Sequence, residues 1–230
     1  MRLDKFLKDT GFGSRKEVKQ IIKQKRVSVN DIIVSNEGLS VDENNDIIKV
    51  DNNQVIYIKY IYIMLNKPQG VVSATIDNLH TTVIDLIKEF QYLEPFPVGR
   101  LDIDTEGLLL ITNDGALSHN LLSPKKHVDK TYYLETDEEL TKEDINSIEK
   151  GVLIDEELTL PAKLEIISEK KYLLTIHEGK FHQVKRMILS VGKCVTYLKR
   201  VKFGPLSLDE NLPLGSYRLL TNDEIELLKK

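Results

Sequence analysis

Residues 99–112 read GRLDIDTEGLLLIT, a polar loop with three carboxylates and one arginine that runs directly into an apolar stretch. Leu108 to Thr112 is expected to be a buried strand, because a short continuous apolar run followed by the turn signal Asn113-Asp114-Gly115 is typical of one. A polar loop anchored on a rigid strand is a common way to hold a reactive side chain at a cleft. Asp102 in such a loop can act as a nucleophile or as an electrostatic partner of a sugar carbon that develops positive charge.

Two other interpretations of this loop stay open from the residues alone. Asp102 and Asp104 could bind a divalent cation, although no flanking pattern completes a calcium-binding loop. Asp104, Thr105 and Asp114 could instead serve only as turn and capping residues.

A second cluster, EGKFHQVKRM at residues 178–187, predicts an amphipathic helix. Apolar residues recur at helical spacing and a glycine stop follows them: Val184, Met187, Ile188, Val191 and Gly192. Lys185 lies beside this apolar stripe, where a half-buried amine needs a carboxylate partner. Lys180, Arg186 and Lys193 would remain for phosphate groups, unless the helix is only a core element with a solvated basic face.

The first 58 residues are expected to form a small separate domain of two short helices and a β-rich end. Ser14 and Glu17 form a capping box that starts the second helix, and the sequence from Val27 to Val34 alternates and turns at Asn30-Asp31 as a hairpin does. The polar face of the second helix carries four cations, Arg15, Lys16, Lys19 and Lys23.

Residues 59–230 contain several strand-like runs with shorter helical stretches between them and no regular βαβ rhythm. This pattern favours an α+β domain with a mixed, largely antiparallel sheet and a central cleft. The expected strands include Tyr132–Glu135, Lys163–Ile167 and Tyr172–His177, and Thr82–Phe90 is expected to be helical.

Charge is distributed unevenly along the chain, although the net charge is only −4. Residues 1–30 carry nine basic against three acidic side chains, residues 176–204 carry seven against one, and residues 137–170 carry eleven acidic side chains against four lysines. Two basic patches on an acidic body indicate a directed nucleic-acid-binding face, unless they are merely solvated surfaces.

Composition excludes several other classes. No apolar run approaches the ~20 residues of a membrane span, and the N-terminus lacks a secretory pattern, so a cytoplasmic protein is expected. No zinc-ligand spacing is present, and the single cysteine, Cys194, is expected to be a small buried residue.

Several motifs carry a resemblance to known families. Arg2-Leu3-Asp4-Lys5-Phe6-Leu7, Gly13-Ser14-Arg15-Lys16-Glu17 and Arg26-Val27-Ser28-Val29-Asn30 resemble the S4 RNA-binding domain. Residues 62–220 resemble the pseudouridine synthases of the RsuA type in five pieces that appear in family order: Leu65–Val71, Gly99–Leu110, Lys130–Tyr132, Glu178–Met187 and Leu214–Leu220.

The resemblance implies a set of site residues. Asp102 matches the catalytic aspartate, Tyr132 the tyrosine that stacks on the target base, and Lys185 the basic residue that pairs with the aspartate. It also implies contacts to RNA from side chains of both domains: Arg2, Lys5, Arg15, Lys16, Lys19, Lys23, Arg26, Arg100, Lys180, His182 and Arg186. The implied reaction converts uridine to pseudouridine in RNA and needs no metal and no cofactor.

The lysine at position 185, the Lys67-Pro68-Gln69-Gly70 turn and the short C-terminal end resemble the branch that modifies uridine 516 of 16S ribosomal RNA. The implied substrate is 16S RNA in a small-subunit assembly intermediate, bound by a monomer. Two alternatives remain, a 23S ribosomal RNA pseudouridine synthase and a non-catalytic ribosomal-RNA-binding assembly factor. A metal-dependent hydrolase built on Asp102, Asp104 and Glu106 is a more distant possibility.

Overall fold

The computed structural model describes residues 1–123 and 126–230 of the chain. It divides into two compact units, one of residues 1–61 with residues 89–94 and one of residues 62–88 with residues 95–230. The division therefore falls three residues after the expected boundary, at the start of a strand. No helix within the described ranges has the length and apolar character needed to cross a membrane.

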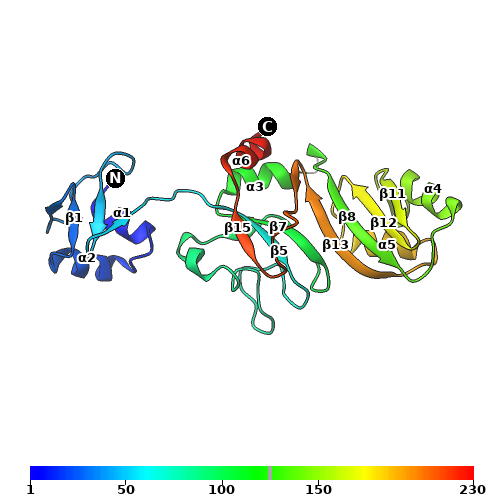
Figure 1. The fold of residues 1–230 in the computed structure, drawn as a ribbon, viewed down its shortest axis with the longest axis horizontal. Coiled ribbons are helices and arrows are strands. Elements are labelled where there is room, and N and C mark those ends of the chain that lie inside the picture. Colours follow the sequence, from blue (N-terminus) through cyan, green and yellow to red (C-terminus); the bar gives the residue numbers. More distant parts are fainter. Residues whose placement is uncertain (124–125) are drawn as a thin grey trace. The chain divides into compact units, whose positions relative to one another are not determined.

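The first unit combines two helices with a four-stranded antiparallel sheet (Figure 1). The helices are α1 (Leu3–Asp9) and α2 (Arg15–Lys23), and the strands lie in the order β2 (Ile32–Ile33), β1 (Val27–Val29), β3 (Ile48–Val50) and β4 (Asn53–Val55). The predicted hairpin is confirmed, since β1 and β2 pair antiparallel and Asn30 and Asp31 both have positive φ. This backbone conformation is the one that a two-residue hairpin turn requires.

Helix α2 begins as its sequence predicts. The Ser14 side chain accepts a hydrogen bond from the Glu17 backbone N–H, and the Glu17 carboxylate accepts one from the Ser14 N–H. Val18 and Ile22 are buried in a core that also contains Leu3, Phe6 and Leu7 of α1. Because the apolar residues face this core, the basic residues of α2 lie on its exposed side.

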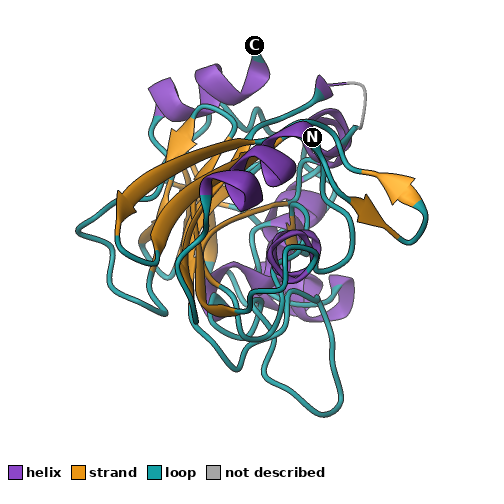
Figure 2. Ribbon diagram, turned by 90° about the vertical axis from the view of Figure 1, so that its right-hand side faces the viewer, coloured by secondary structure: helices purple, strands orange, loops and turns teal. Residues whose placement is uncertain are grey.

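The second unit is built on one large sheet, which Figure 2 shows as a curved layer of strands. Its strands lie in the order β11 (Lys163–Ser168), β12 (Lys171–Ile176), β8 (Lys130–Thr136), β13 (Val195–Phe203), β7 (Glu106–Thr112), β5 (Tyr62–Lys67) and β15 (Tyr217–Leu219). Two short strands pair at its margins, β14 (Leu206–Ser207) with β13 and β6 (Phe96–Pro97) with β7. Only the pairing of β13 with β7 is parallel, so the domain is the mixed, largely antiparallel α+β fold expected from the sequence.

Four helices and a small hairpin accompany the sheet in the described part of this unit. They are α3 (Gly115–Leu122), α4 (Lys142–Lys150), the hairpin of β9 (Leu153–Ile154) and β10 (Glu157–Leu158), α5 (Gln183–Leu189) and α6 (Asn222–Lys229). The 3₁₀ helix η1 (Lys88–Leu93) has all but its first residue in the segment 89–94, which belongs to the first unit. Helices α3 and α6 lie side by side over β5 and β7 (Figure 1).

The junction between β7 and β13 depends on a glycine. Gly107 has φ +103°, and a Cβ at this position would lie 2.2 Å from the backbone oxygen of Arg200. No side chain fits in that space, so only glycine lets the two strands approach. Because Gly107 directly follows the polar loop at residues 99–106, this contact also fixes where that loop ends.

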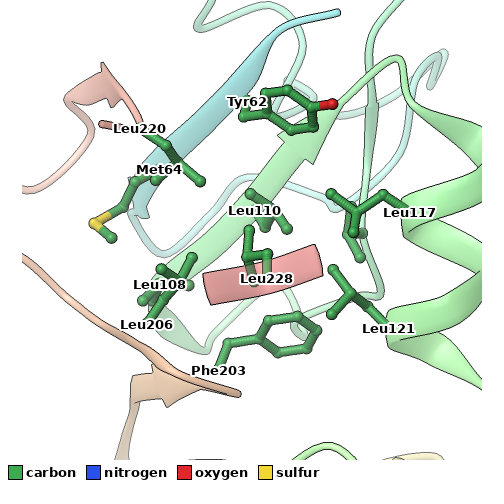
Figure 3. Close-up of a cluster of buried hydrophobic side chains, with 11 residues drawn as sticks. Tyr62, Met64, Leu108, Leu110, Leu117, Leu121, Phe203, Leu206, Leu220 and Leu228 are labelled. Atoms are coloured by element: carbon green, nitrogen blue, oxygen red, sulfur yellow. The ribbon is translucent and has the colours of Figure 1, made fainter. Parts of the chain in front are cut away.

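The core of the second unit lies between β5, β7 and the helices α3 and α6. Figure 3 shows Met64 and Tyr62 of β5 beside Leu108 and Leu110 of β7, with Leu117 and Leu121 of α3 opposite. Leu109 and Ile111 on the other face of β7 are also fully buried. A strand buried on both faces explains why its sequence is continuously apolar rather than alternating.

Two expectations are wrong. Thr82–Phe90 is not an α-helix but a series of turns followed by η1. Thr82 and Asp85 bond reciprocally through side chain and backbone, as Ser14 and Glu17 do at the start of α2, but here the arrangement closes a single turn. The N–H of Val83 donates to the carbonyl oxygen of Val72, which holds the start of this segment against a strand-like neighbour instead of a helix, and Val83 and Ile87 are buried as expected. Cys194 is exposed rather than buried, because it lies between the turn at Gly192 and the first residue of β13.

Candidate active site

A cavity of about 410 Å³ in the second unit collects most of the residues predicted for catalysis. Its walls come from the loop at residues 99–105, from β8 and β13, and from the segment that joins β12 to α5. The predicted residues among its lining are Arg100, Asp102, Tyr132, Lys180, His182 and Lys185. These positions span more than eighty residues of sequence, and the sheet brings them to one place.

The backbone of the Asp102 loop is held from behind by Lys67, the last residue of β5. The Lys67 side chain is fully buried, and its Nζ donates hydrogen bonds to the carbonyl oxygens of Asp102 and Thr105 at 2.9 Å and to that of Pro68 at 3.1 Å. Burial lowers the pKa of Lys67 to about 8, although nearby carboxylates act in the opposite direction. The sequence around Lys67 predicts only a turn. Lys67 and Asp102 are far apart along the chain, so their contact could not be predicted from neighbouring residues.

Ser73 provides a second anchor for the same loop. Its hydroxyl donates to the carbonyl oxygen of Leu101 at 2.9 Å and accepts from the N–H of Leu101 at 3.0 Å. The N–H of Gly70 donates to the carbonyl oxygen of Ile103. With backbone groups fixed on both sides of Asp102, the carboxylate is presented from a preorganised loop.

Lys185 reaches this loop from α5 and makes the carboxylate contact that its half-buried position requires. Its Nζ donates to Asp102 Oδ2 at 3.0 Å and to Asp104 Oδ1 at 2.5 Å, and the Lys185 and Asp102 side chains are 25% and 27% exposed. Burial disfavours the charge on Lys185, but the hydrogen bonds to Asp104 and Asp102 outweigh this effect and raise its pKa. Burial likewise disfavours the Asp104 carboxylate, and the bond from Lys185 outweighs it, so the pKa of Asp104 is lowered.

His182 lies on the other side of the same carboxylate. Its Nε2 is 3.6 Å from Asp102 Oδ1, and its ring stacks on that of the exposed Phe181 with centroids 3.8 Å apart. His182 has φ +50° immediately before α5. The structure therefore places this predicted RNA-binding residue beside Asp102, with one oxygen of the carboxylate bonded to Lys185 and the other facing an imidazole.

Tyr132 and Arg200 form a buried part of the cavity wall. They are partners on the adjacent strands β8 and β13, and their exposed fractions are 8% and 1%. Arg200 was not among the predicted site residues, because Lys199, Arg200 and Lys202 appeared only as part of a basic segment. One signal could have indicated that Arg200 is buried. Arg200 lies two positions after the apolar Leu198, and residues two apart in a strand share a face, so Arg200 is expected on the same buried face as Leu198.

The predicted RNA-binding residues of the first unit do not line this cavity. Lys5, Arg15, Lys16 and Lys23 are exposed, and none of them has an ion pair among the described residues. The other three each have a carboxylate partner: Arg2 with Asp4, Lys19 with Glu37 and Arg26 with Asp51. The helix face of α2 thus offers free cations, whereas the flanking positions are partly neutralised.

Lys180 and Arg186 are paired with acidic residues of the β9–β10 hairpin rather than left free. Arg186 donates from both terminal nitrogens to Asp155, and Lys180 Nζ lies 2.7 Å from Glu157. Arg100 is exposed and lines the cavity. Of the cations predicted for phosphates near the cavity, Arg100 is thus the one without an ion pair within residues 1–123 and 126–230.

The three carboxylates of the loop do not converge on a metal position. The Lys185 ammonium lies between Asp102 and Asp104, while Glu106 accepts a hydrogen bond from the Tyr197 hydroxyl at 2.6 Å. In the described ranges no group of three or more His, Cys, Asp or Glu residues is arranged to hold a metal ion. The donor geometry of the loop is that of an ion pair, not of a cation site.

Comparison with known proteins agrees with this arrangement. Residues 61–190 match the family model described as RNA pseudouridylate synthase, and residues 1–47 match the S4 domain. An uncharacterized RNA pseudouridine synthase of Bacillus subtilis is 48% identical, with 100% of this chain and 99% of the relative covered. The ribosomal small subunit pseudouridine synthase A of Vibrio cholerae is 40% identical, with 100% of both chains covered.

A solved structure shows the same fold over the whole chain. The crystal structure of a pseudouridylate synthase superposes with a TM-score of 0.71 at 38% sequence identity, covering 99% of each chain.

Proposed function

We propose that this chain, which belongs to the RNA pseudouridylate synthase family, isomerises one uridine of small-subunit ribosomal RNA with Asp102 as the catalytic carboxylate. Membership of the family makes the chain an RNA pseudouridine synthase, an isomerase. The further assignment is to uridine 516 of 16S RNA, presented in an assembly intermediate to a cytoplasmic monomer.

The observation that carries the proposal is the Asp102–Lys185 pair in a cavity large enough for a nucleobase, in a chain that matches a small-subunit synthase from end to end. A non-catalytic RNA clamp needs cations that meet phosphates, and it has no use for a carboxylate whose loop is fixed from behind by Lys67 and Ser73.

On this proposal each side chain has a role. A uridine inside an RNA stack must be extruded to reach Asp102, at a cost of a few kcal/mol that stacking on Tyr132 offsets. Lys185 holds Oδ2 of Asp102, which leaves Oδ1 to act on the ribose, either by adding to C1′ or by taking the C2′ proton, and in both cases the bond between N1 and C1′ breaks. The uracil then turns, and C5 bonds to C1′ as the Asp102–C1′ bond breaks or, in the second case, as Asp102 returns the proton to C2′.

Release of tritium from 16S RNA labelled at C5 of uracil tests the proposal, because the C5 hydrogen is lost to water only if the isomerisation is completed. Naked transcript and a protein-bound assembly intermediate are compared, and the product position is mapped. Asp102→Asn is expected to abolish release while RNA affinity stays within a few-fold. Asp104→Asn is the matched control, because it removes a carboxylate from the same loop and the same lysine but leaves Asp102 in place.

Each outcome decides one part of the proposal. Release by the wild type at one small-subunit position, and none by Asp102→Asn, supports reaction, target and carboxylate together. Release from 23S RNA alone would replace the target but not the chemistry. Release by Asp102→Asn at the wild-type rate would remove Asp102 from the mechanism.

A further inference from the structure

Two cations of the cavity wall, Lys130 and Arg200, have no carboxylate partner within 4 Å in residues 1–123 and 126–230. Lys130 Nζ donates to the carbonyl oxygen of Val128 at 2.9 Å, and Arg200 Nε donates to that of Leu108 at 2.8 Å. Arg200 Nη2 is buried and has no hydrogen-bond partner in the described structure. Both cations therefore keep their charge and part of their hydrogen-bonding capacity unused.

A β-bulge places these cations together. The register of β13 against β8 shifts between Arg200 and Lys202, so that Arg200 and Phe203 fall on the same face although they are three positions apart, which in a regular strand would place them on opposite faces. The Arg200 guanidinium then lies 5.0 Å and the Lys130 ammonium 5.8 Å from the centre of the Phe203 ring. Lys130 and Tyr132, two residues apart on β8, share this face.

Burying two neighbouring cations, Lys130 and Arg200, costs free energy unless a negatively charged group lies beside them. Burial lowers the pKa of Lys130, the nearby charge of Arg200 lowers it further, and Asp129 and Glu178 act in the opposite direction. Removing a charge from water is repaid only by a close partner of opposite sign or by several hydrogen bonds. Of the other charged groups of the cavity, Asp102 is bonded to Lys185, His177 to Asp129 and Lys180 to Glu157. Arg100, which has no ion pair among the described residues, is exposed to water and so does not bear the same cost.

The isomerisation supplies a negative group. When the bond between N1 and C1′ breaks, its electron pair stays on the uracil, and the charge is shared by N1 and the two carbonyl oxygens. After C5 has bonded to C1′, the C5 proton leaves to water, its electron pair restores the C5–C6 double bond, and N1 takes a proton. The free uracil is therefore negatively charged from the cleavage of the N1–C1′ bond until C5 bonds to C1′, which leaves a neutral ring with an N1–C6 double bond until the two proton transfers.

We propose that Lys130 and Arg200 form a hydrogen-bonding and electrostatic site for the carbonyl oxygens of the extruded uracil, which stabilises the base while it carries negative charge. This inference rests on the proposed function, and it adds two catalytic residues to Asp102 and Lys185. Donors aimed at developing charge in a water-poor site lower the barrier because they need no reorganisation.

The base, rather than a phosphate, is the group that reaches this wall. Arg200 is 1% exposed and pairs in register with Tyr132, on which the base is expected to stack, whereas the exposed Arg100 lies where a backbone phosphate is accessible. A half-turn of uracil about its N3–C6 axis exchanges N1 with C5 and also exchanges the two carbonyl groups. A donor fixed at one carbonyl position therefore meets a carbonyl oxygen before and after the base turns.

The test uses the full chain with whichever 16S substrate the wild type modifies. Lys130→Met and Arg200→Met are each expected to lower the single-turnover rate of pseudouridine formation about 100-fold, with RNA affinity within about 3-fold, because the charge they meet is absent from bound substrate. Lys202→Met is the matched control, since it removes an exposed cation from the same strand, and its rate should equal that of the wild type.

Thio-substituted RNA separates a contact with the base from a structural role. Sulfur accepts hydrogen bonds weakly, so 2-thiouridine or 4-thiouridine at the target position should slow the wild type about tenfold. In Lys130→Met and Arg200→Met, thio substitution should cause no further decrease in rate, because the side chain that donates the hydrogen bond has been removed. If the losses from thio substitution and from mutation multiply, neither cation contacts a carbonyl group, and the inference is overturned.

The remaining outcomes are equally decisive. If Arg200→Met does not fold, the combination of Lys130→Met with thio-substituted RNA decides alone. Lys130→Met is expected to fold, because in the described structure the Lys130 ammonium donates a hydrogen bond to a loop carbonyl oxygen and forms no ion pair. A full rate in Lys130→Met with unmodified RNA would overturn the inference while leaving the reaction in place. A wild type that modifies no ribosomal RNA would instead contradict the proposed function.

Discussion

The two basic segments of the chain have similar charge in the sequence but opposite uses in the structure. On α2, Arg15, Lys16 and Lys23 face solvent without an ion pair among the described residues. In residues 176–204, Lys180 and Lys185 are each bonded to a carboxylate, as is Arg186. The first segment thus leaves three cations of α2 without an ion pair in the described structure, while the second holds Lys180, Lys185 and Arg186 in ion pairs.

The comparison teaches that net charge along a sequence does not predict free charge on a surface. The partner of Lys185 is 83 residues away in sequence, and that of Arg186 is 31 residues away. Tertiary contacts bring these carboxylates to α5 from the loop before β7 and from the β9–β10 hairpin. Among the described residues, only Lys19 of the four α2 cations has an ion pair, with Glu37.

The largest effect should come from breaking the central pair of the second segment. Lys185→Met leaves Asp102 and Asp104 without their shared donor and is expected to lower the rate of pseudouridine formation at least about 1000-fold, the upper part of the range for single catalytic groups. Lys185→Arg keeps the charge and should stay within about tenfold of the wild type. Equal rates for Lys185→Met and the wild type would show that the pair has no catalytic role.

Lys67 extends the comparison to a cation that is completely internal. Lys67→Met leaves three buried carbonyl oxygens without a donor and is expected to destabilise the second unit by about 2–4 kcal/mol in urea unfolding at pH 7. Because the folded state lowers the pKa of Lys67 to about 8, the unfolded state binds more protons between about pH 8 and pH 10.5, and this group makes stability rise with pH there. This increase in stability with pH should be absent from Lys67→Met. If Lys67→Met still shows the increase, another titratable group causes it.

Neutralising the free face of the first segment should affect binding rather than chemistry. Arg15→Gln with Lys16→Gln is expected to weaken RNA binding about tenfold and to reduce the slope of log affinity against log salt by about 1.4–1.8, because two fewer counterions are released. Fluorescence anisotropy between 50 and 200 mM salt, roughly the range over which such slopes are resolved, measures both quantities. Arg186→Gln is the control from the paired segment and should change the slope less, since Asp155 already neutralises that charge.

The smallest effect should come from releasing a paired cation. Asp155→Asn frees Arg186 and is expected to tighten RNA binding about 2- to 3-fold at low salt, with a steeper salt slope. Glu156→Gln is the matched control, because it removes the same charge from the same hairpin tip but breaks no ion pair in the described structure. If the two variants behave alike, the pairing of Arg186 does not limit its contact with RNA.

Short-range signals in the sequence were sufficient to predict most of the helices, hairpins and strands named in advance. The Ser14–Glu17 capping box, the Asn30-Asp31 hairpin and the apolar run of β7 are each fixed by neighbours a few residues away, and each is present as expected. The helix predicted at Thr82–Phe90 is absent because contacts with Val72, outside the segment, hold its first residues, and only a single turn forms between Thr82 and Asp85.

Only part of the site could be predicted from the sequence. Asp102, Tyr132 and Lys185 were named from motifs, and the structure places all three on one cavity. Lys67 and Arg200 were missed as site residues, because each acts through a contact with a strand or loop that is remote in sequence. Cys194 was assigned to the interior from its residue type alone, and its place between a turn and a strand overrode that preference.

By itself the sequence determined which segments form helices and strands, which residue types carry the chemistry and which family the chain resembles, because those properties depend on neighbouring residues and on motif order. The tertiary structure decided which charges are free and which are paired. That choice depends on contacts between residues tens of positions apart, such as Lys185 with Asp102 and Arg186 with Asp155. Burial strengthens the contact of Lys185 with Asp102, since a charge withdrawn from water must find its partner inside the fold, whereas Asp155 stays exposed to water beside Arg186.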